Sequence, residues 1–512
     1  MGVMATLIEY RNERIRKLNE LKSLGVNPYP SKSNRTVTNS DILENFSNYE
    51  NNNVTVVGRI VALRKLGRLN FIKIRDESGE IQIVWERAEE PTSPVNYENS
   101  ELELSNINLL DTGDFVEVTG PVFKTKTEEI SVKVTVFRIL TKSLRPMPLD
   151  YEGFNNIELR YRQRYLDMNV NADVKKDLLL RSKVVETIRQ FLLKQNFVEI
   201  ETPVLQPIYG GASAKPFITY HNKLESEFYL RISTELYLKR AVVGGFEKVF
   251  EFARNFRNEG IDRSHNPEFT MLEFYWAYAD YNDLMKLTTD LFHEILISVY
   301  GKTSFEYQGH VLDFSEIRKV TFRDLILEKT GVDIQDIKKE DLVKEMKSRN
   351  MDVSSDAPLK DLLDEFYKHT CRKDIIQPIY LLDYPAEMIP LAKKKQTNPK
   401  YIESIQLVCC GFELLKAYSE LNDPIDQLER LSEDQKGLEE GTSEESMNVD
   451  IDFISALEYG MPPTAGWGMG IDRLVSFLAN KPAIKDVIMF PTLKPEEHDE
   501  TTKNMYPNVK FK

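Results

Sequence analysis

Residues 250–278 read FEFARNFRNEGIDRSHNPEFTMLEFYWAY and form the chemically densest stretch of the sequence. Aromatic residues alternate with other residues up to Phe256, the chain passes Gly260, and the alternation resumes at Phe269. Alternation with a period of two on both sides of a turn predicts a β-hairpin. Its tip would carry three polar side chains and one aromatic ring: Arg257, Glu259, His265 and Phe269.

The chemistry of this tip favours a nucleotide ligand. An arginine fork binds phosphate oxygens through two hydrogen bonds, and an aromatic ring beside a basic group can stack on a purine. A charged hairpin taken alone is more often a loop with satisfied ion pairs, but RNFRNEG at 254–260 followed by HNPEF at 265–269 is too specific for that reading. The sequence has no GxxxxGK[ST], HExxH or GxSxG pattern, so phosphates would be held by another device.

Two further segments could contribute to the same site. GWGMGIDRLVSFL at 466–478 has three glycines that allow close backbone approach, and Arg473 stands at the start of an amphipathic helix. Taken alone, a glycine-rich turn that enters a helix usually serves the packing of the backbone. FELLKAYSELNDP at 412–424 places Glu413 and Glu420 seven residues apart, which is two turns of a helix but opposite faces of a strand. Two carboxylates near phosphates could share Mg²⁺, although surface glutamates are the commoner reading.

Short β-like runs separated by turn residues occupy residues 54–140. About five strands in this length fit a small closed barrel of the oligonucleotide-binding type. Phe71 and Gln82 could share an outward face, with Arg59 and Arg64 on the strand before, which would suit single-stranded RNA. A barrel without a ligand remains the alternative. The basic helix expected at 5–24 could equally be an ordinary solvated helix or bind a phosphate backbone.

Composition bounds the class of protein. The chain has 512 residues with Lys+Arg 67 and Asp+Glu 81, a net charge of −14, and ordinary globular fractions of hydrophobic and charged residues. The acidic balance argues against indiscriminate DNA coating. No apolar run approaches the roughly 18 residues of a membrane span, and no signal peptide is recognisable. Three cysteines, Cys371, Cys409 and Cys410, fit neither a disulfide framework nor a zinc site. These features predict a cytoplasmic protein without membrane partners.

The change of pattern along the chain predicts its organisation. We expect an N-terminal helical extension at 1–50, the barrel at 51–145 and a linker at 146–170. A second domain would occupy 171–512, with a helical insertion near 318–372 that is rich in Lys, Glu and Asp.

The segments described above resemble, in this order, the three signature motifs of class II aminoacyl-tRNA synthetases. The first would be a helix at 174–196 with the strand FVEIETPVL at 197–205, the second the hairpin with Arg257, and the third GMGIDR with Arg473. Within the class the chain is similar to the lysyl-tRNA synthetase family. That similarity rests on further stretches, which cover nearly the whole chain: GGASAKPF at 210–217, TELYLKR at 234–240, HNPEFTMLEFY at 265–275, AYSELNDP at 417–424, KTKT at 124–127 and RYRQRYLD at 160–167.

The resemblance implies an α+β multidomain fold, with an N-terminal OB-type β-barrel followed by a class II catalytic domain built on an antiparallel sheet flanked by helices. It implies ATP-dependent activation of L-lysine to lysyl-adenylate and transfer to the 3′ end of tRNA(Lys), with Mg²⁺ as cofactor and a homodimer as the assembly. An aspartyl or asparaginyl relative would want a cation where Glu420 stands. A non-catalytic RNA-binding paralogue should have lost Arg257 or Arg473, and a ligase that lysylates a protein would lack the barrel.

The resemblance also implies a role for individual residues. The catalytic residues would be Arg257 and Arg473. ATP would be bound by Arg257, Glu259, His265, Asn266, Phe269, Glu413, Gly470, Asp472 and Arg473. Lysine would be bound by Gly211, Glu235, Glu273, Tyr275, Lys416, Tyr418 and Glu420. The metal ligands would be Glu413 and Glu420, and the tRNA anticodon would meet Arg59, Arg64, Phe71 and Gln82.

Lys416 departs from the family pattern, which usually has asparagine at this position on the floor of the amino-acid site. An added cation near substrate lysine is repulsive unless it faces a carboxylate, a phosphate or another acid. Lys416 could also partly neutralise Glu420. The geometry at this position is therefore the open point of the predicted site.

Overall fold

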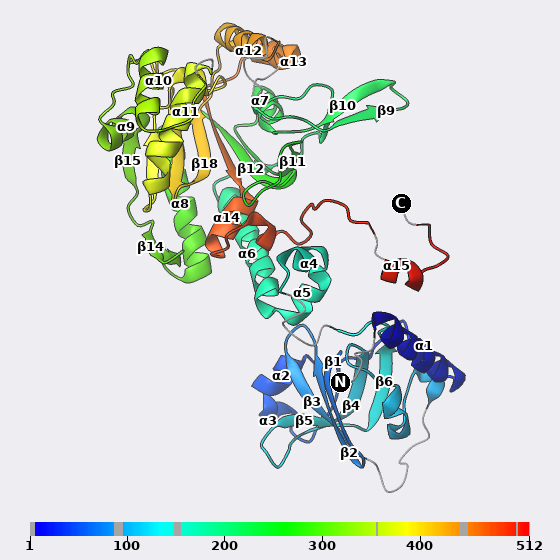
Figure 1. Ribbon diagram of the computed structural model, residues 1–512. Helices are drawn as coiled ribbons and strands as arrows, with labels where there is room; N and C mark the ends of the chain where they lie inside the picture. The colour runs from blue at the N-terminus through cyan, green and yellow to red at the C-terminus, as the bar shows by residue number, and fades with distance from the viewer. Residues whose placement is uncertain are drawn as a thin grey trace. The chain divides into compact units, whose positions relative to one another are not determined.

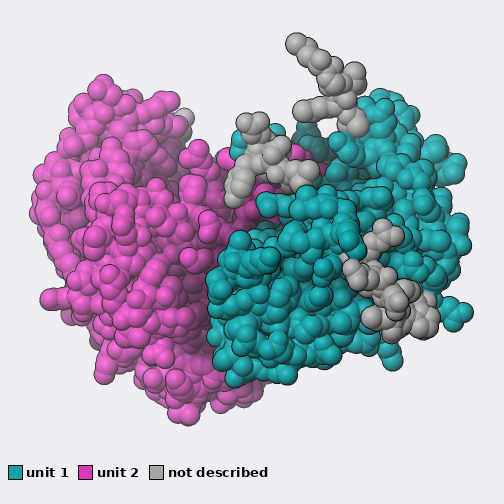
Figure 2. All heavy atoms as spheres, turned by 90° about the horizontal axis from the view of Figure 1, so that it is seen from below, with its two compact units in different colours: residues 1–156, 494–512 teal, residues 157–493 magenta. Residues whose placement is uncertain are grey.

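The computed structural model describes residues 6–86, 96–147, 155–354, 357–439, 449–497 and 500–510. It divides into two compact units, one of Met1–Asn156 with Lys494–Lys512 and one of Ile157–Leu493 (Figure 2). Among the described residues no helix has both the length and the apolar character that a membrane crossing needs.

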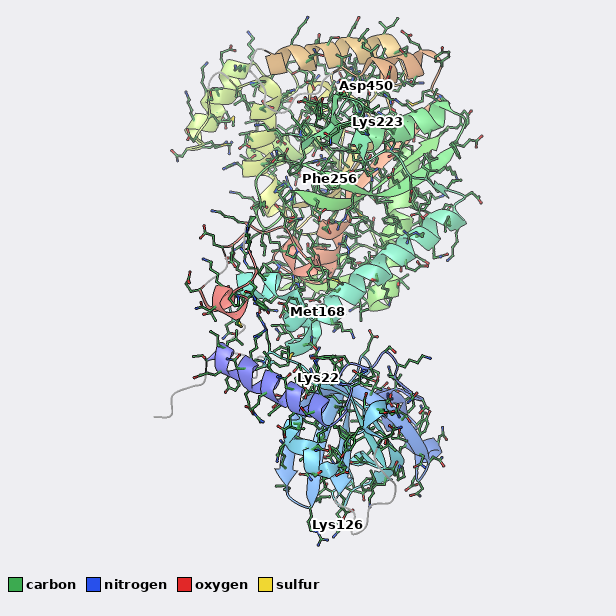
Figure 3. The ribbon with its side chains drawn as sticks, turned by 90° about the vertical axis from the view of Figure 1, so that its right-hand side faces the viewer. Lys22, Lys126, Met168, Lys223, Phe256 and Asp450 are labelled. Carbon is green, nitrogen blue, oxygen red and sulfur yellow. The ribbon has the colours of Figure 1, made fainter. Side chains whose placement is uncertain are left out.

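The first unit contains a closed β-barrel (Figure 1). Its strands follow the order β1-β2-β3-β5-β4-β6, and the pairing of β1 with β4 closes the barrel. Residues 129–140, the last β-like run of this region, form two strands, since β5 pairs with β3 and β4 whereas β6 pairs with β4 alone. The strands are β1 (Asn53–Leu66), β2 (Leu69–Arg75), β3 (Glu80–Glu86), β4 (Phe115–Lys124), β5 (Ile130–Lys133) and β6 (Val136–Thr141). Lys126, within the KTKT stretch, is exposed in the turn after β4 (Figure 3).

A bulge in β1 decides which side chains share the outer face of the barrel. The register between β1 and β2 shifts between Ile60 and Ala62. Residues 59 and 64 would point to opposite faces of a regular strand, but the extra residue brings both to one face. Arg59 is thereby paired with Arg75, and Arg64 with Phe71.

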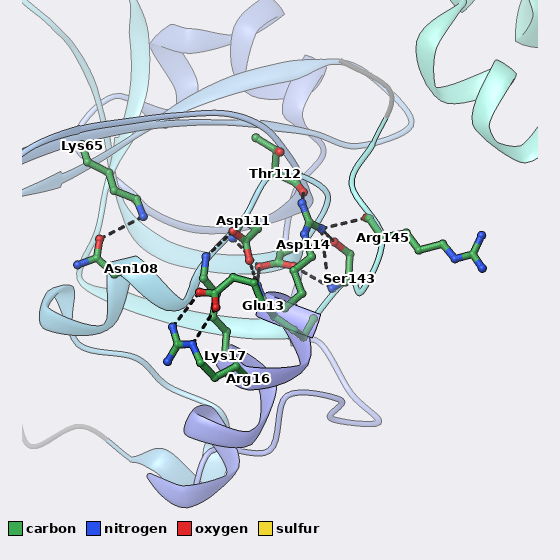
Figure 4. A network of polar contacts seen from close by, with 12 residues as sticks. Glu13, Arg16, Lys17, Lys65, Asn108, Asp111, Thr112, Asp114, Ser143 and Arg145 are labelled. Atoms are coloured by element: carbon green, nitrogen blue, oxygen red, sulfur yellow. Dashed lines mark hydrogen bonds and ion pairs between the residues drawn. The ribbon is translucent and has the colours of Figure 1, made fainter. Parts of the chain in front are cut away.

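Helix α1 (Leu7–Ser23) packs against the barrel through ion pairs and hydrogen bonds (Figure 4). The buried Arg14 donates to the carbonyl oxygens of Thr112 and Arg145 at 2.9 and 3.0 Å. Lys17 pairs with Asp111 at 2.6 Å, which also binds the buried Lys142. Arg14 and Lys17, two basic residues of the predicted helix, are thus engaged within the unit. Helices α2 (Asn39–Glu44) and α3 (Phe46–Tyr49) follow.

Residues far along the chain complete this unit. Helix α15 (Glu500–Met505) belongs to it, and Met505 is buried. The Tyr506 hydroxyl accepts a hydrogen bond from Arg145 at 3.3 Å, and the Arg11 guanidinium lies 5.3 Å from the centre of its ring. Tyr506 therefore contacts two cations, one from helix α1 and one from the residues that follow β6.

The second unit is built on one large sheet with the order β15-β16-β17-β18-β19-β12-β11-β7. All neighbours are antiparallel except the end pairs β15–β16 and β11–β7. The strands are β7 (Val198–Glu199), β11 (Lys248–Phe256), β12 (Glu268–Ala277), β15 (Arg318–Thr321), β16 (Ile379–Leu382), β17 (Ser404–Cys409), β18 (Phe412–Ser419) and β19 (Thr464–Gly470). The hairpin predicted at 250–278 is the pair β11 and β12, with Phe256 at the end of β11 (Figure 3).

Helices pack on both faces of the sheet and form a separate hydrophobic core on each. On one face, apolar residues of α6 (Ala172–Lys194), α8 (Tyr281–Tyr300) and α14 (Ile471–Leu478) form a continuous core with the strands. On the other face a second core gathers around α7 (Glu235–Val243), α9 (Phe322–Thr330), α10 (Lys339–Ser348), α11 (Leu359–Thr370) and α13 (Ile451–Glu458). This second face also carries the pocket described below. Helices α4 (Ile157–Arg162), α5 (Arg164–Val170) and α12 (Pro424–Glu439), with strands β8 (Leu205–Gln206), β9 (Ile218–His221), β10 (Ser226–Leu230), β13 (Ser304–Tyr307) and β14 (His310–Asp313), complete the unit.

Three expectations from sequence differ in detail. The continuous strand expected at 197–205 is two short strands in different sheets, because β7 joins β11, β8 joins β10, and Pro203 between them has no amide to donate. The expected linker 146–170 contains helices from Ile157 onward, and its residues 148–154 lie outside the described part. The region 318–372 begins with a strand of the main sheet and is helical only afterwards.

Candidate active site

A cavity of about 840 Å³ lies in the second unit. It gathers residues from the helix α7, both strands of the hairpin, β18, β19 and the start of α14. Every residue predicted for ATP, lysine or metal lines it: Gly211, Glu235, Arg257, Glu259, His265, Asn266, Phe269, Glu273, Tyr275, Glu413, Lys416, Tyr418, Glu420, Gly470, Asp472 and Arg473.

The register of the sheet orders these side chains into rows. One row runs across Tyr418, Gly466 and Tyr275. The next row runs across Lys416, Gly468 and Glu273. Because β19 supplies glycine to both rows, the floor of the pocket is bare backbone there, and a Cβ on Gly466 would lie 1.9 Å from an oxygen of Glu420.

Three glutamates around these rows form an acidic end of the pocket: Glu235 on α7, Glu273 in the second row and Glu420 after the end of β18. The Tyr418 hydroxyl donates to the Glu235 carboxylate at 2.9 Å. Lys239 Nζ is fully buried and lies 2.7 Å from Glu235 and 2.5 Å from Oε2 of Glu420. Glu273 accepts hydrogen bonds from Ser233 Oγ at 3.2 Å and the Thr234 amide at 3.4 Å. Three buried carboxylates therefore face one ammonium, an excess of two negative charges if all are ionised.

This excess raises the pKa of the carboxyls. Burial, together with the charge of Glu235, raises the pKa of Glu273 to about 7. Burial also raises the pKa of Glu420 well above its usual value, although Lys239 opposes the effect. Both shifts mean that negative charge is costly here without a further cation. The acidic end is thus suited to a ligand that brings positive charge.

The partner of Glu420 differs from the one expected. Lys416 does not neutralise Glu420; the fully buried Lys239 does, from helix α7. The Oε1 atom of Glu420 has no hydrogen-bond partner among the described residues. Lys239 stands four residues after Glu235, on the same face of α7, and this spacing was available in the sequence.

Glu413 and Glu420 both line the pocket, although a regular strand would have turned them to opposite faces. The register between β17 and β18 shifts between Leu407 and Val408, so that Glu413 pairs with Val408 while Leu415 pairs with Leu407. The extra residue, Leu414, is a β-bulge that restores a common face. No group of three or more His, Cys, Asp or Glu side chains arranged to hold a metal occurs among the described residues.

The opposite end of the pocket carries the cations of the hairpin tip and of α14. The Arg257 guanidinium lies 5.1 Å from the centre of the Phe269 ring. Arg473 Nη2 lies 3.1 Å from His265 Nε2, and His265 Nδ1 lies 2.8 Å from Asp262. Since arginine can only donate, Nε2 must accept and Nδ1 must carry the proton that is donated to Asp262. This chain of contacts orients Arg473 toward the pocket.

Two of the predicted ATP residues have different surroundings. Asp472 is buried and accepts hydrogen bonds from Arg181 at 2.6 Å and the Thr270 amide at 2.7 Å, so it joins α14 to α6 and β12. Asn266 donates to the Glu268 carbonyl at 2.7 Å, while its own buried amide oxygen has no partner among the described residues. Asp472 therefore holds α14, α6 and β12 together. Asn266, in contrast, can accept a hydrogen bond from a ligand.

The four residues predicted for RNA lie on the outer face of the barrel. Lys73 pairs with Gln82 and Phe71 with Val84, so Phe71 and Gln82 are diagonal neighbours on one face. Gln82 donates to Ser131 at 3.0 Å. Arg64 is exposed beside Phe71, whereas Arg59 donates to the Gly113 carbonyl and stacks on Phe115 at 4.3 Å.

Some lining residues were not predicted from sequence. Ser233 binds Glu273, and Tyr384 donates to Gln406 at 2.5 Å beside the Lys416 row. The residues after 359 also form one wall of the pocket, with Lys360, Asp364 and Arg372 among them. They come from the region that sequence patterning indicated only as a helical insertion.

Comparison with known proteins agrees with this architecture. Residues 156–494 match the family described as tRNA synthetases class II (D, K and N), and residues 54–140 match the OB-fold nucleic acid binding domain. A lysine–tRNA ligase of Clostridium tetani (strain Massachusetts / E88) is 45% identical over 489 residues, which cover 94% of this chain and 95% of that protein. A lysine–tRNA ligase of Clostridium novyi (strain NT) is 44% identical, with 94% of each chain covered. One of Christiangramia forsetii is 42% identical, with 96% of this chain and 88% of that protein covered.

Proposed function

The chain belongs to the class II tRNA synthetases (D, K and N), and from this premise we propose how the two ends of its pocket divide the reaction. It is a lysine–tRNA ligase, which uses ATP to join lysine to tRNA. The observation that carries the assignment of residues is the acidic end, where three buried carboxyls face one ammonium and would hold two excess negative charges when all are ionised. Lysine brings two ammonium groups, so its binding would make that end neutral.

At this acidic end, Glu235 and Glu273 would take the α-ammonium of lysine, while Tyr275 and Glu420 would take the ε-ammonium. Gly211, with a φ of 81°, would contribute a backbone contact. An uncharged analogue of similar shape would leave buried carboxylates uncompensated, which is a strong basis for discrimination. Lys239 would remain in place and hold Glu420 toward the substrate.

At the other end, Phe269 would stack on the adenine, and Arg257 and Arg473 would bind the phosphates. The lysine carboxylate attacks the α-phosphorus, the new C–O–P bond forms, and the bond to the departing pyrophosphate breaks. No side chain needs to remove a proton in this step. Arg257 and Arg473 would act by position and by charge, since fixed cations stabilise the negative charge that develops on the phosphates.

A magnesium ion fits beside the phosphates. Glu413 forms no ion pair with any described residue, so its carboxylate would be available to the ion. Mg²⁺ is usually held by one or two carboxylates together with substrate phosphates, so Glu413 would hold it. Glu420, which pairs with Lys239 at the acidic end beyond the other end of β18, does not fit the expected role of second ligand to the same ion. When bound, the ion would offset charge on the pyrophosphate.

The barrel would bind the anticodon of tRNA(Lys), with Phe71 stacking on a base, Gln82 reading its edge and Arg64 near a phosphate. Of the two barrel arginines, Arg59 would contribute less, because it already contacts Gly113 and Phe115. We assign the chain to the cytoplasm on the basis of its three free thiols and to a homodimer on the basis of the exposed apolar residues treated below.

The function is tested by ATP–pyrophosphate exchange with each of the twenty amino acids in turn, followed by charging of tRNA(Lys). Lysine should be the amino acid that supports exchange at low concentration. Exchange that depends on aspartate or asparagine, or no exchange with any amino acid, would contradict the proposed reading of the pocket.

The substitution Phe71→Ala tests whether the two compact units have separate roles. Loss of one stacked base costs about 1–3 kcal/mol, so tRNA charging should fall roughly five- to 150-fold. Lysine-dependent exchange should stay within about twofold, because Phe71 belongs to the other compact unit. Leu66→Ala, an exposed apolar residue at the end of the same strand pair, serves as the control. An equal fall in exchange and charging would contradict the anticodon assignment.

A further inference from the structure

The turn between β17 and β18 carries two consecutive cysteines. Cys409, the last residue of β17, pairs with Phe412, the first residue of β18, so the loop consists of Cys410 and Gly411. Both loop residues have a positive φ, 48° at Cys410 and 71° at Gly411. Positive φ at both positions of a two-residue hairpin loop is typical of a type I′ turn, in which asparagine, aspartate and glycine are the usual residues. Cysteine is therefore an unusual residue at the first position.

This turn brings the two thiols together. Neighbouring residues of a regular strand point to opposite faces of a sheet, but the left-handed conformation of Cys410 breaks that alternation. The Sγ atoms of Cys409 and Cys410 lie 3.2 and 3.5 Å from the same Ile376 carbonyl oxygen, and both residues pack in one hydrophobic core. A hydrogen bond from the Cys409 thiol lowers the pKa of Cys410 and raises the pKa of Cys409 itself. Cys410 is thus the thiol that ionises first, and it is only half-buried.

Two thiols in this arrangement suit chelation better than a disulfide. Consecutive Cα atoms lie about 3.8 Å apart, whereas residues joined by a disulfide usually have Cα atoms roughly 4.4–6.8 Å apart, so a direct S–S bond would be strained. One atom inserted between the two sulfurs lengthens the bridge and relieves that strain.

The number of ligands decides which atom fits. The described residues hold no group of three or more His, Cys, Asp or Glu side chains suited to a metal, so a tetrahedral Zn²⁺ would lack partners. Cu(I) with two ligands prefers them on opposite sides, which adjacent residues cannot provide. Trivalent arsenic is soft and pyramidal, and it needs only two neighbouring thiolates when a hydroxyl or organic group fills its third position.

We propose that Cys409 and Cys410 form a binding site for trivalent arsenic compounds, and that occupation of this site disturbs the adjacent pocket. With an organic arsenoxide, two S–As bonds form, the As–O bonds break, and the two thiol protons leave with the oxygen as water. Arsenic stays trivalent, so the step needs neither oxidant nor reductant. The dithiol site goes beyond the proposed function, and only its effect on the reaction rests on that function.

The backbone of the turn connects the thiols to the pocket. Gly411, Phe412 and Glu413 all line the pocket, and the Gly411 carbonyl accepts a hydrogen bond from Arg372 at 2.9 Å. Cys409 is fully buried, so a bulky arsenic group held by both sulfurs cannot fit without a shift of the turn. That shift would reach Glu413, the proposed magnesium ligand.

The test uses phenylarsine oxide as the probe and intact-protein mass spectrometry as the readout. The folded wild type should gain the mass of one reagent less one water. The dithiol 2,3-dimercaptopropanol should remove the label, whereas excess 2-mercaptoethanol should not. Cys410→Ser and Cys409→Ala should each weaken binding about a hundred- to ten-thousandfold, because a single thiolate cannot chelate.

Cys371→Ala is the matched control. Cys371 is also buried, and its Sγ lies 3.4 Å from the Thr370 hydroxyl rather than beside a second thiol. Its substitution should leave uptake of the arsenical unchanged. Equal uptake by the wild type and Cys410→Ser, loss of uptake in Cys371→Ala, or no uptake by the folded wild type would each overturn the inference.

Exchange kinetics test the link to the pocket. A misplaced catalytic group can cost up to about a hundredfold, so saturating phenylarsine oxide should lower wild-type kcat/KM for ATP about ten- to a hundredfold and that of Cys410→Ser less than about twofold. Unchanged exchange by fully labelled wild type would overturn the effect on the pocket. If the untreated wild type shows no lysine-dependent exchange, the proposed function fails, while uptake of the arsenical still reports on the dithiol site.

Discussion

Lys239 and Glu420 form a buried ion pair whose two partners lie on different elements, α7 and the end of β18. Glu420→Gln should lower lysine kcat/KM a few hundred- to a few thousand-fold, because breaking one side of a buried charge pair costs about 3–5 kcal/mol. ATP KM should change much less, since Arg257, Phe269 and Arg473 remain. An unchanged lysine kcat/KM would remove Glu420 from the lysine site.

Pairwise coupling identifies the partner of Glu420. In urea unfolding, Lys239→Met and Glu420→Gln should be non-additive by about 0.5–3 kcal/mol. Lys416→Asn with Glu420→Gln should add to within about 0.5 kcal/mol, because no ion pair joins them. Coupling to Lys416 instead of Lys239 would contradict the structure.

Glu273 predicts a pH dependence of lysine binding. Its pKa of about 7 in the free protein should fall when an ammonium binds beside it. Below about pH 7, lysine must displace a proton, so affinity should rise roughly tenfold between pH 6 and 8 and level off above the pKa. Calorimetry in buffers of different ionisation enthalpy should detect the released proton. Glu273→Gln should flatten the profile, and a flat wild-type profile would refute the assignment.

The same raised pKa has a consequence for stability. The pKa of Glu273 is higher in the folded protein than its ordinary value of about 4.5, so its protonated carboxyl contributes to the stability of the folded state. This stabilisation is fully present below about pH 4.5 and is lost as the pH rises toward 7. Saturating lysine should oppose this loss by stabilising the ionised form.

At the residue scale, sequence motifs identified many of the residues of the pocket, and every residue predicted for ATP, lysine or metal lines one cavity. Their partners could not be derived in the same way. The pairing of Glu420 with Lys239 depends on the end of a strand meeting a helix nearly two hundred residues earlier in the chain. The contact of His265 with Arg473 likewise joins two motifs that only the folded sheet brings together.

At the scale of elements, two β-bulges decide which residues share a face. Alternation of apolar and polar residues predicted the strands β1 and β18, but not the extra residue in each. A bulge is set by cross-strand pairing, which a single strand's pattern does not contain. Without these bulges, the side chains of Arg59 and Arg64 would lie on opposite faces of β1. The side chains of Glu413 and Glu420 would likewise lie on opposite faces of their sheet.

Strand β19 provides a matched pair of substitutions. A Cβ at Gly466 would lie 1.9 Å from a Glu420 oxygen and 2.7 Å from the Tyr275 ring, whereas one at Gly468 would lie 2.9 Å from the flexible end of Met271. Gly466→Ala should therefore lower lysine kcat/KM at least about a hundredfold, while Gly468→Ala should cost about tenfold or less. Steady-state kinetics of exchange would check this order, and a larger effect at Gly468 would contradict it.

At the scale of the whole molecule, sequence patterning predicted the barrel followed by a sheet-based catalytic domain, and this fold class is confirmed. It did not predict that residues 494–512 pack with the barrel unit. That association depends on contacts of Tyr506 with Arg11 and Arg145, which are distant in sequence and lie in no recognisable motif.

Self-association is the prediction that belongs to this scale. Val198 on β7, Leu205 on β8 and the nearby Ile208 are exposed, although all three are large and apolar. These residues lie close together in the chain, on or beside edge strands of two sheets. Exposed apolar residues of this kind are typical of an interface, and we expect a two-fold dimer there. Val198→Asp with Leu205→Asp should shift light-scattering mass from dimer toward monomer at micromolar concentration. Ile425→Asp, exposed on α12, is the control. A monomeric wild type with full charging activity would rule the dimer out.

The place of residues 494–512 in the barrel unit gives the protein a fixed order of completion during synthesis. The ribosome makes Met1–Asn156 first, then all of Ile157–Leu493, and only then the segment that contacts Arg11 and Arg145. At about 5–20 residues per second, the interval lasts roughly twenty seconds to a minute. During that time these two arginines lack their contacts with Tyr506 and can meet other anionic or aromatic partners. The first unit to begin folding on the ribosome is thus also the last to be finished.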